Sequence, residues 1–300
     1  MATAALARRA GSGLLADERL PALAFVTLYG AGFVGARLGL PHAGPLAFLA
    51  LRIALAAVLL AALARAFRAP WPARQALPAI VLAGLLTVGV FSVGVFVSIA
   101  GGVPPAVSAM IIALHPVLVA TLAPGLLGER VAPRRWTGLL LGLAGVFLVL
   151  RDGLASGAAP GWAVAASFVG LAGLSAGNLL QKARCAAMHP FAGGAVQCAA
   201  CAVACALGWL AFEPTPVRWT GEFVVALLWM AVVVSVGAVS LLVVLIRRDA
   251  VSRVAGLFYL VPVSAALAAW LLFDQGIAPL QWLGIAVAAT GVALAIRNPG

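Results

Sequence analysis

PVLVATLAPGLLGERVAPRRWTGLLLGLAGVFLVLR, the stretch Pro116–Arg151, decides the fold because the chain repeats it 146 residues later. The second copy, Pro262–Arg297, reads PVSAALAAWLLFDQGIAPLQWLGIAVAATGVALAIR and aligns with the first without a gap. Thirteen of 36 positions are identical, against about four expected by chance for so biased a composition. The sequence therefore contains a duplicated unit.

The composition places this unit in a membrane. Hydrophobic residues make up 64% of the 300 residues, charged residues only 9%, and the mean hydropathy is +1.14. A soluble domain usually carries about 25% charged residues, so lipid must cover most of this surface. Backbone polar groups in lipid need partners within the chain, and an all-α integral membrane protein meets that need. We expect the lipid bilayer as a partner and no nucleic acid, although the net charge is +11.

Ten apolar segments have about the length that crosses a bilayer. They lie near 21–40, 45–67, 76–99, 104–127, 134–150, 160–181, 189–211, 220–246, 252–273 and 279–296. With a cytoplasmic N-terminus, fifteen of the nineteen basic residues fall in cytoplasmic segments. This positive-inside bias predicts ten transmembrane helices, both termini in the cytoplasm and a bacterial-type inner (plasma) membrane location.

The duplicated unit predicts an inverted repeat. It spans five helices, and an odd number makes the two copies face opposite sides of the membrane. The loop Glu129–Arg135 of the first copy holds three arginines, whereas Asp274–Ala278 of the second holds none. We divide the chain into a cytoplasmic tail at 1–20, a first repeat at 21–151 and a second at 160–297. Inverted five-helix repeats are typical of secondary transporters, whose site lies between the halves near the midplane.

The run Ala106–Gly145 carries the marker residues of a known domain. They are Pro116, Glu129 with Arg130, Trp136, Gly138, Gly145 and, in the second helix, Arg52. On these residues the chain resembles the EamA domain of the drug/metabolite transporter superfamily, present twice over roughly 21–297. The resemblance implies a ten-helix basket around a central cavity that exports amino acids and related metabolites. YddG-type aromatic amino acid exporters look most similar, although Asp274-Gln275 stands in the second copy where Glu is usual.

Two prolines are candidate hinges. Pro116 and Pro262 fall about midway along the predicted fourth and ninth helices, at equivalent positions of the repeat. Each proline removes a backbone hydrogen bond and clashes with the preceding turn, so both helices should kink or unwind locally. We expect the prolines to act as hinges and to free carbonyls for a cavity, although proline is also simply common in membrane helices.

Two polar residues at membrane depth are candidate substrate contacts. His115 is expected near the midplane, where it could bond or stack on a substrate, carry a proton, or sit neutral against a neighbouring helix. Arg52 lies about 10 Å into the second helix. Its guanidinium suits a carboxylate, and snorkelling to lipid headgroups is the alternative.

Aromatic residues complete the candidate substrate site. Tyr29, Phe91, Trp229 and Tyr259 lie well inside predicted spans, where they could line a stacking pocket or simply pack. Cys198, Cys201 and Cys205 recur along one helix face, and we interpret them as buried apolar residues. We expect no metal site and no cofactor.

These features predict a secondary transporter that exports amino acids, possibly aromatic ones, or related small metabolites by alternating access. Export of cationic drugs or other metabolites is the alternative within the class, and a passive channel is a further one. No nucleophile–base pair, metal site or Walker A motif occurs, so we expect neither an enzyme nor direct use of ATP. The oligomeric state stays open, a monomer included.

Overall fold

The protein is built from helices. The computed structural model describes residues 19–103, 105–154, 159–213, 216–273 and 278–296, and no strand occurs within these ranges. The helices in chain order are α2 (Arg19–Gly30), α3 (Gly32–Gly39), η1 (Leu40–His42), α4 (Pro45–Ala66), η2 (Arg74–Ala76), α5 (Leu77–Gly84), η3 (Leu85–Val90), α6 (Phe91–Ala100), α7 (Pro105–Ile112), α8 (His115–Leu127), α9 (Pro133–Leu154), α10 (Gly161–Arg184), α11 (Pro190–Phe212), α12 (Gly221–Trp229), η4 (Met230–Ala238), α13 (Val239–Arg248), α14 (Val251–Gly256), η5 (Leu257–Tyr259), α15 (Leu260–Phe273) and α16 (Pro279–Ile296).

Several consecutive helices combine into longer apolar stretches. Within the described ranges, eight stretches are long and apolar enough to cross a membrane. Two shorter apolar helices, Leu20–Gly30 and Pro279–Ala295, fall in the first and last of the ten predicted segments. The prediction of an all-α membrane protein is therefore confirmed at the level of helices and apolar spans.

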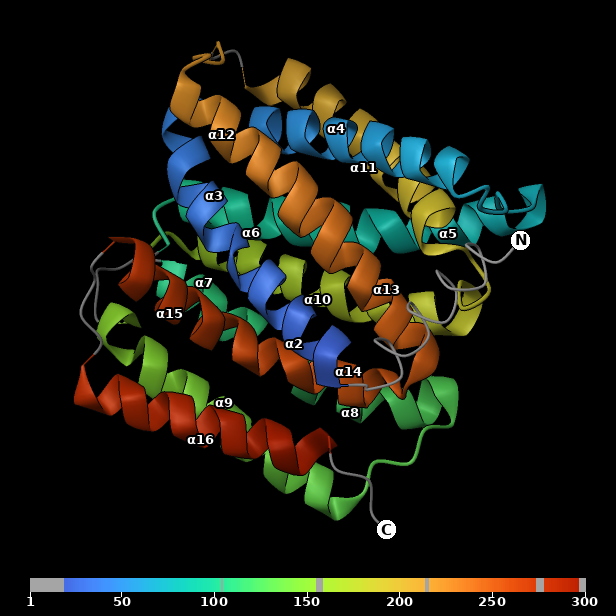
Figure 1. Cartoon of the computed structure of the whole chain (residues 1–300). Helices are drawn as coiled ribbons and strands as arrows, with labels where there is room; N and C mark the ends of the chain where they lie inside the picture. The colour runs from blue at the N-terminus through green and yellow to red at the C-terminus, as the bar shows by residue number, and fades with distance from the viewer. Residues whose placement is uncertain (1–18, 104, 155–158, 214–215, 274–277, 297–300) are drawn as a thin grey trace, which may run out of the picture.

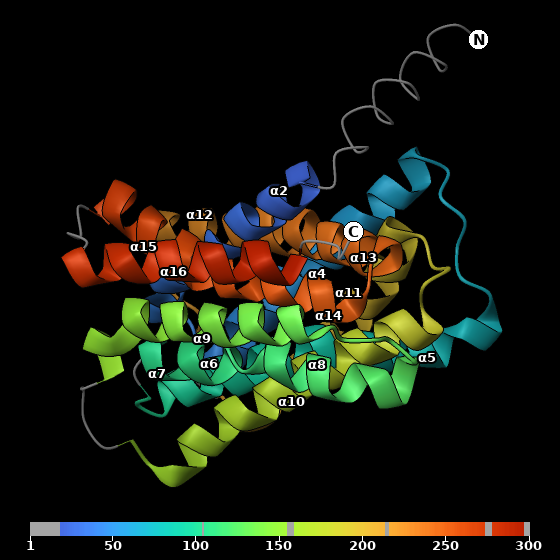
Figure 2. The same ribbon diagram turned by 90° about the horizontal axis from the view of Figure 1, so that it is seen from below.

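The connections gather at two ends of the bundle (Figures 1 and 2). Helix α2 begins and α16 ends at one end, where α4 also leads to α5, α8 to α9, α10 to α11 and α13 to α14. We call it the Arg-rich end, because it holds Arg65, Arg68, Arg74, Arg130, Arg134, Arg135, Lys182, Arg184, Arg247, Arg248 and Arg253. The opposite end carries the connections from α9 to α10 and from α11 to α12.

The most extensive helix pairs join equivalent parts of the two sequence repeats: α9 with α16, and α4 with α11. Between α9 and α16 the backbones touch through glycine. A Cβ at Gly138 would lie 2.7 Å from the carbonyl oxygen of Gly291, and one at Gly145 would lie 2.7 Å from that of Gly284. The two contacts run in opposite sequence order, so α9 and α16 are antiparallel. Both pairs lie side by side in Figures 1 and 2.

Irregular helix geometry also recurs at the repeat spacing. The π-helical segments η3 and η4 interrupt two long stretches at matching places, Leu85–Val90 and Met230–Ala238. A break at Ala113–Leu114 separates α7 from α8, and the 3₁₀ turn η5 at Leu257–Tyr259 separates α14 from α15. In membrane proteins such interruptions are tolerated where the backbone lines a cavity or is buried in protein.

The glycine contact between α9 and α16 predicts a selective loss of stability. Gly145→Ala places a methyl group 2.3 Å from the backbone nitrogen of Ala288, which cannot move without separating the helices. We expect a cost of about 1–3 kcal/mol, read as a lower melting temperature of the purified protein in detergent. Gly125→Ala is the matched control, because nothing lies within 4 Å of its added Cβ and alanine favours helix more than glycine. Equal melting temperatures for the two variants would contradict the proposed packing.

Candidate functional site

A cavity lies between the repeats, in the half of the bundle away from the Arg-rich end. Its larger part, the Arg52 chamber, has a volume of about 120 Å³. Apolar side chains supply most of the lining, and the polar groups are few: Arg52, Tyr29, Thr87, Ser92 and Ser235. The two π-helical segments both contribute, through Thr87 and Val88 of η3 and through Met230, Val234 and Ser235 of η4.

A second part adjoins the first. We call it the Pro262 chamber, because Pro262 and Phe258 line one wall and Ala109, Ile112 and Ala113 line another. Its volume is about 70 Å³. The chambers share four lining residues, Tyr29, Phe91, Val95 and Ile99. They therefore form a continuous apolar region with a guanidinium at one side and the two broken helices at the other.

Arg52 is buried in this apolar region without a carboxylate. Only 5% of the residue is exposed. One Nη donates to the hydroxyl of Ser92 at 3.2 Å, the other lies 3.9 Å from the sulfur of Met230, and the guanidinium carbon stands 5.3 Å from the ring centre of Phe96. The Nε has no hydrogen-bond partner among the described residues. No described carboxylate forms an ion pair with Arg52, whose side chain reaches inward rather than to the surface.

This arrangement is costly for the empty protein. Removing a charged group from water carries a penalty of several kcal/mol, which a matched counterion can offset. Here the contacts of the guanidinium are a single hydroxyl, a sulfur and an aromatic face. Arginine presents a planar fork of donors that fits both oxygens of a carboxylate. The donors of this guanidinium are therefore chemically suited to pair with an anionic group.

Aromatic rings surround the junction of the two chambers. Tyr29 lines both, and its ring centre lies 5.3 Å from that of Phe25 and 5.5 Å from that of Phe258. Phe91, the first residue of α6, also lines both. Three of the residues singled out in the sequence, Arg52, Tyr29 and Phe91, are thus brought together around one cavity.

His115 lies beside the cavity and not in its lining. It is fully buried, with Nδ1 2.9 Å from the hydroxyl of Ser175 and Nε2 3.2 Å from the amide nitrogen of Asn178. The ring also packs edge-on against Phe258, at 4.9 Å between centres. His115 ties α8 to α10 and supports the wall formed by Phe258.

Trp229 and Tyr259 take other positions. Trp229 is 40% exposed, and its indole nitrogen donates to the carbonyl of Ala31, at the break between α2 and α3. Tyr259 is fully buried with its ring against Gly142 of α9. Neither residue lines the two chambers. Their sequence positions were suited to a pocket, but helix rotation directs them toward neighbouring helices.

The two prolines stand directly after the helix breaks. Pro116 is buried in the first turn of α8, just past Ala113–Leu114, and Pro262 lies in the first turn of α15, which begins at Leu260 just past η5. The local unwinding expected from the sequence occurs at both sites. Pro262 itself lines the smaller chamber.

Sequence reasoning missed several lining residues. Ser92, Phe96, Met230 and Ser235 all contact Arg52 or line its chamber. The spacing of Val88, Phe91, Ser92, Val95, Phe96 and Ile99 follows one helix face, and that period could have identified the wall. The contribution of η4 had no comparable signal, because a π-helical segment carries no fixed residue type.

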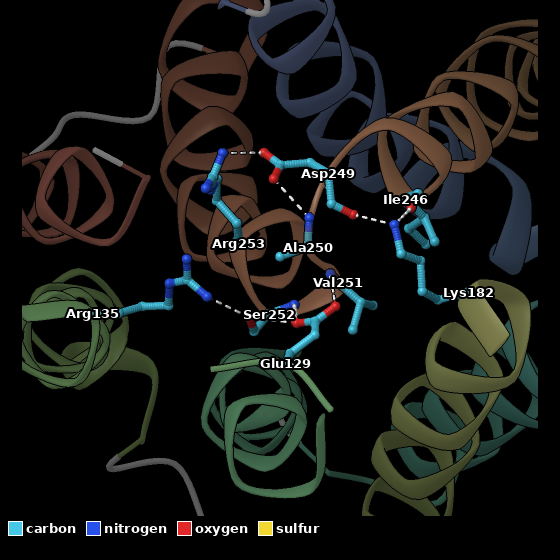
Figure 3. A network of polar contacts seen from close by, with 9 residues as sticks. All are labelled: Glu129, Arg135, Lys182, Ile246, Asp249, Ala250, Val251, Ser252 and Arg253. Carbon is cyan, nitrogen blue, oxygen red and sulfur yellow. Dashed lines mark hydrogen bonds and ion pairs between the residues drawn. The ribbon is translucent and has the colours of Figure 1, made fainter. Parts of the chain in front are cut away.

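Polar side chains lie between the cavity and the Arg-rich end. Gln197 donates to the Oε1 of Gln181 at 2.7 Å, and both residues are buried. Beyond them, at the end itself, Figure 3 shows polar contacts that join residues of both repeats, including Glu129, Arg135 and Ser252. On the other side, buried hydroxyls also join the repeats: Ser167 donates to Ser98 at 2.7 Å and lies 2.8 Å from Ser108, which lines the Pro262 chamber.

The cysteines form no metal site. Cys185, Cys198, Cys201 and Cys205 are free and buried, and the described residues contain no cluster of three or more His, Cys, Asp or Glu side chains arranged for a metal ion. The thiol of Cys201 donates to the carbonyl of Gly84 at 3.2 Å, which ties α11 to the helix that leads into η3.

The apolar spans and the sparsely polar cavity define a multi-pass membrane protein with a small-molecule site. The chain belongs to the EamA-like transporter family, whose pattern it matches twice, over residues 20–151 and 161–297. It is therefore a membrane transporter with two EamA domains, as the sequence resemblance indicated.

Comparison with solved structures agrees on the fold. A crystal structure of another protein, 21% identical in sequence, matches over 92% of this chain and 96% of the other, with a TM-score of 0.78. Identity this low establishes similarity of fold alone. Among curated proteins, none matches the sequence.

The burial of the cysteines predicts that their thiols react slowly with maleimides in the folded protein. Burial raises the pKa of the Cys185 thiol to about 11, so at pH 8 only about one molecule in a thousand carries the reactive thiolate. The other three thiols are buried in the helix packing. We expect a membrane-impermeant maleimide to label the native protein at less than a tenth of the level reached after denaturation. Rapid labelling of the native protein, located by mass spectrometry, would contradict this packing.

Proposed function

We propose that the protein is a secondary transporter that exports amino acids, aromatic ones included, or related carboxylate-bearing metabolites. The observation that carries the proposal is Arg52, a buried guanidinium that lines the central cavity and has no counterion among the described residues. A substrate carboxylate would supply the missing partner and offset the desolvation of both groups. The proposal includes no cofactor and no catalytic residue.

The rest of the cavity fits the remainder of such a substrate. Phe91 and Tyr29 lie at the junction of the chambers, and Phe96 lies against the guanidinium. An apolar or aromatic side chain can stack on these rings, in offset or edge-on geometry. Substrate contact is assigned to Arg52, Tyr29 and Phe91. His115, Trp229 and Tyr259 are assigned to packing, since their contacts are with neighbouring helices.

Alternating access between two inverted five-helix repeats is the proposed mechanism. The antiparallel contact of α9 with α16 supports it, because Gly138 meets Gly291 as Gly145 meets Gly284, the reciprocal pattern of a two-fold relation. The repeats would be 21–151 and 160–297, in a ten-span bacterial inner-membrane protein with a cytoplasmic tail at 1–20 and both termini cytoplasmic. Pro116 and Pro262, beside the helix breaks, would be the bending points.

Cationic solutes and a passive channel are the competing functions. A cation would meet the charge of Arg52 with no carboxylate among the described lining residues. An open channel would need a continuous path, whereas buried polar layers lie between the cavity and the Arg-rich end. Counterflow of labelled solutes in proteoliposomes separates these cases, since saturable exchange is a property of carriers.

Replacing Arg52 tests the carboxylate site. Arg52→Ala should reduce amino acid counterflow about 100-fold or more, because truncating one member of a buried charge pair commonly costs 2–5 kcal/mol. Arg52→Lys should retain an intermediate rate, since it keeps the charge and loses the fork. Arg65→Ala is the matched control, because Arg65 is exposed on the same helix. If Arg52→Ala protein, present at normal levels in the membrane, showed counterflow that saturates with amino acids as in the wild type, Arg52 would not be the carboxylate contact.

Substrate analogues test which charged end is recognised. The described cavity lining holds one cation and no carboxylate. We therefore expect 3-phenylpropionate and phenylpyruvate, which lack the ammonium group, to compete with labelled phenylalanine within about tenfold of phenylalanine itself. Phenethylamine, which lacks the carboxylate, should not compete at the same concentrations. The reverse order of competition would favour export of cationic solutes.

A further inference from the structure

Glu129 forms the polar contact that joins the two repeats at the Arg-rich end. Glu129 follows Gly128, which ends α8. The φ of Gly128 is 67°, in the left-handed region that glycine tolerates. From this turn the carboxylate reaches the start of α14. Oε1 accepts from the backbone nitrogen of Val251 at 2.8 Å, and Oε2 accepts from the hydroxyl of Ser252 at 2.9 Å and its backbone nitrogen at 3.4 Å (Figure 3).

This carboxylate replaces a cap that α14 lacks. The N-cap residue, Ala250, has no side chain that could accept from the exposed amides. Unsatisfied amides at a helix start favour a negative group. Arg135, at the start of α9, completes the chain by donating to the hydroxyl of Ser252 at 2.7 Å. Ser252 is fully buried. While the contact is intact, its hydroxyl therefore bonds Glu129 and Arg135 and does not bond solvent.

The repeat cannot build the same contact at the opposite end. At the repeat spacing of 146 residues, Pro105 stands for Val251, Ala106 for Ser252 and Gln275 for Glu129. Proline has no backbone N–H, alanine has no hydroxyl, and glutamine has no charge. The equivalence is supported by the helix starts, because α7 begins at Pro105 and α14 at Val251. The chemistry of the contact is therefore specific to one end of the molecule.

We propose that Glu129, Ser252 and Arg135 form a latch that closes the Arg-rich end, and that transport requires its release. The latch makes closure at this end the more stable state of the empty carrier, so the cavity faces the opposite side at rest. The position of both chambers in the half of the bundle away from the latch agrees with this assignment.

A similar carboxylate contact lies at the other end, but it joins two helices that pack along their whole lengths. Glu213 accepts from the backbone nitrogens of Leu46 and Ala47, at 2.9–3.0 Å, and so caps α4. Helices α4 and α11 pack along their lengths, with Gly208 against Leu46 and Gly194 against Leu60. This pair can move as one body without breaking its cap, which makes Glu213 a matched control for Glu129.

Thiol accessibility tests the latch without any substrate. The reporters are Val243→Cys, which lies between the cavity and the Arg-rich end, and Val95→Cys, which lines both chambers. Membrane vesicles of each orientation are treated with an impermeant maleimide, and the protein without a reporter is the blank. In the parent we expect Val95→Cys to be labelled from the opposite end and Val243→Cys to be protected from the Arg-rich end.

In the Glu129→Gln background, labelling of Val243→Cys from the Arg-rich end should rise about tenfold, the change that losing one hydrogen bond to a charged group allows. Ser252→Ala should give a smaller rise, because it leaves the bond to the amide of Val251. Glu213→Gln should give none. Unchanged labelling in Glu129→Gln, or an equal rise in Glu213→Gln, would overturn the latch. The latch rests on the proposed alternating access, but labelling needs no solute, so a wrong substrate class would leave this result intact.

Discussion

The need to pair every backbone N–H and carbonyl away from water governs this structure. It makes the apolar chain helical, and it limits departures from the helix to places where other atoms or a cavity receive the freed groups. The π-helical segments η3 and η4 and the breaks beside Pro116 and Pro262 are such departures. All lie at or beside the cavity lining. The same constraint that builds the spans therefore also places the irregular backbone around the site.

The burial of the Arg52 guanidinium is the second constraint on the structure. A guanidinium buried among Ser92, Phe96 and Met230 carries a desolvation cost. Under the proposed function, a substrate carboxylate would offset this cost on binding and restore it on release. A carrier needs binding that is favourable enough to load and weak enough to release, and a buried cation with no carboxylate partner among the described residues would offer this balance.

The two ends of the molecule differ although the repeats share their architecture. Glycine contacts between α9 and α16 follow the two-fold pattern closely, because backbone approach requires the same small residue in both copies. The polar contacts do not follow it. Glu129, Ser252 and Arg135 have Gln275, Ala106 and Gln281 as repeat equivalents, so the other end cannot form a contact of the same chemistry. Under the proposed alternating access, this asymmetric contact would give the two facing states unequal stability.

The sequence by itself determined the class of protein, the spans and the repeat. Hydropathy and helix length depend on local composition, and the thirteen identities between the copies needed no coordinates. It also singled out Arg52, Tyr29, Phe91 and the two prolines, because charged, aromatic and proline residues are conspicuous in an apolar helix.

Only the tertiary structure decided which side chains meet. In the folded protein, Trp229 and Tyr259 contact neighbouring helices, and His115 forms hydrogen bonds with Ser175 and Asn178. The tertiary structure also brought Glu129 to the start of α14, 122 residues away in sequence. Rotation of a helix about its axis and the pairing of distant helix ends depend on the packing of all its neighbours, and no local pattern in an almost uniformly apolar sequence records them.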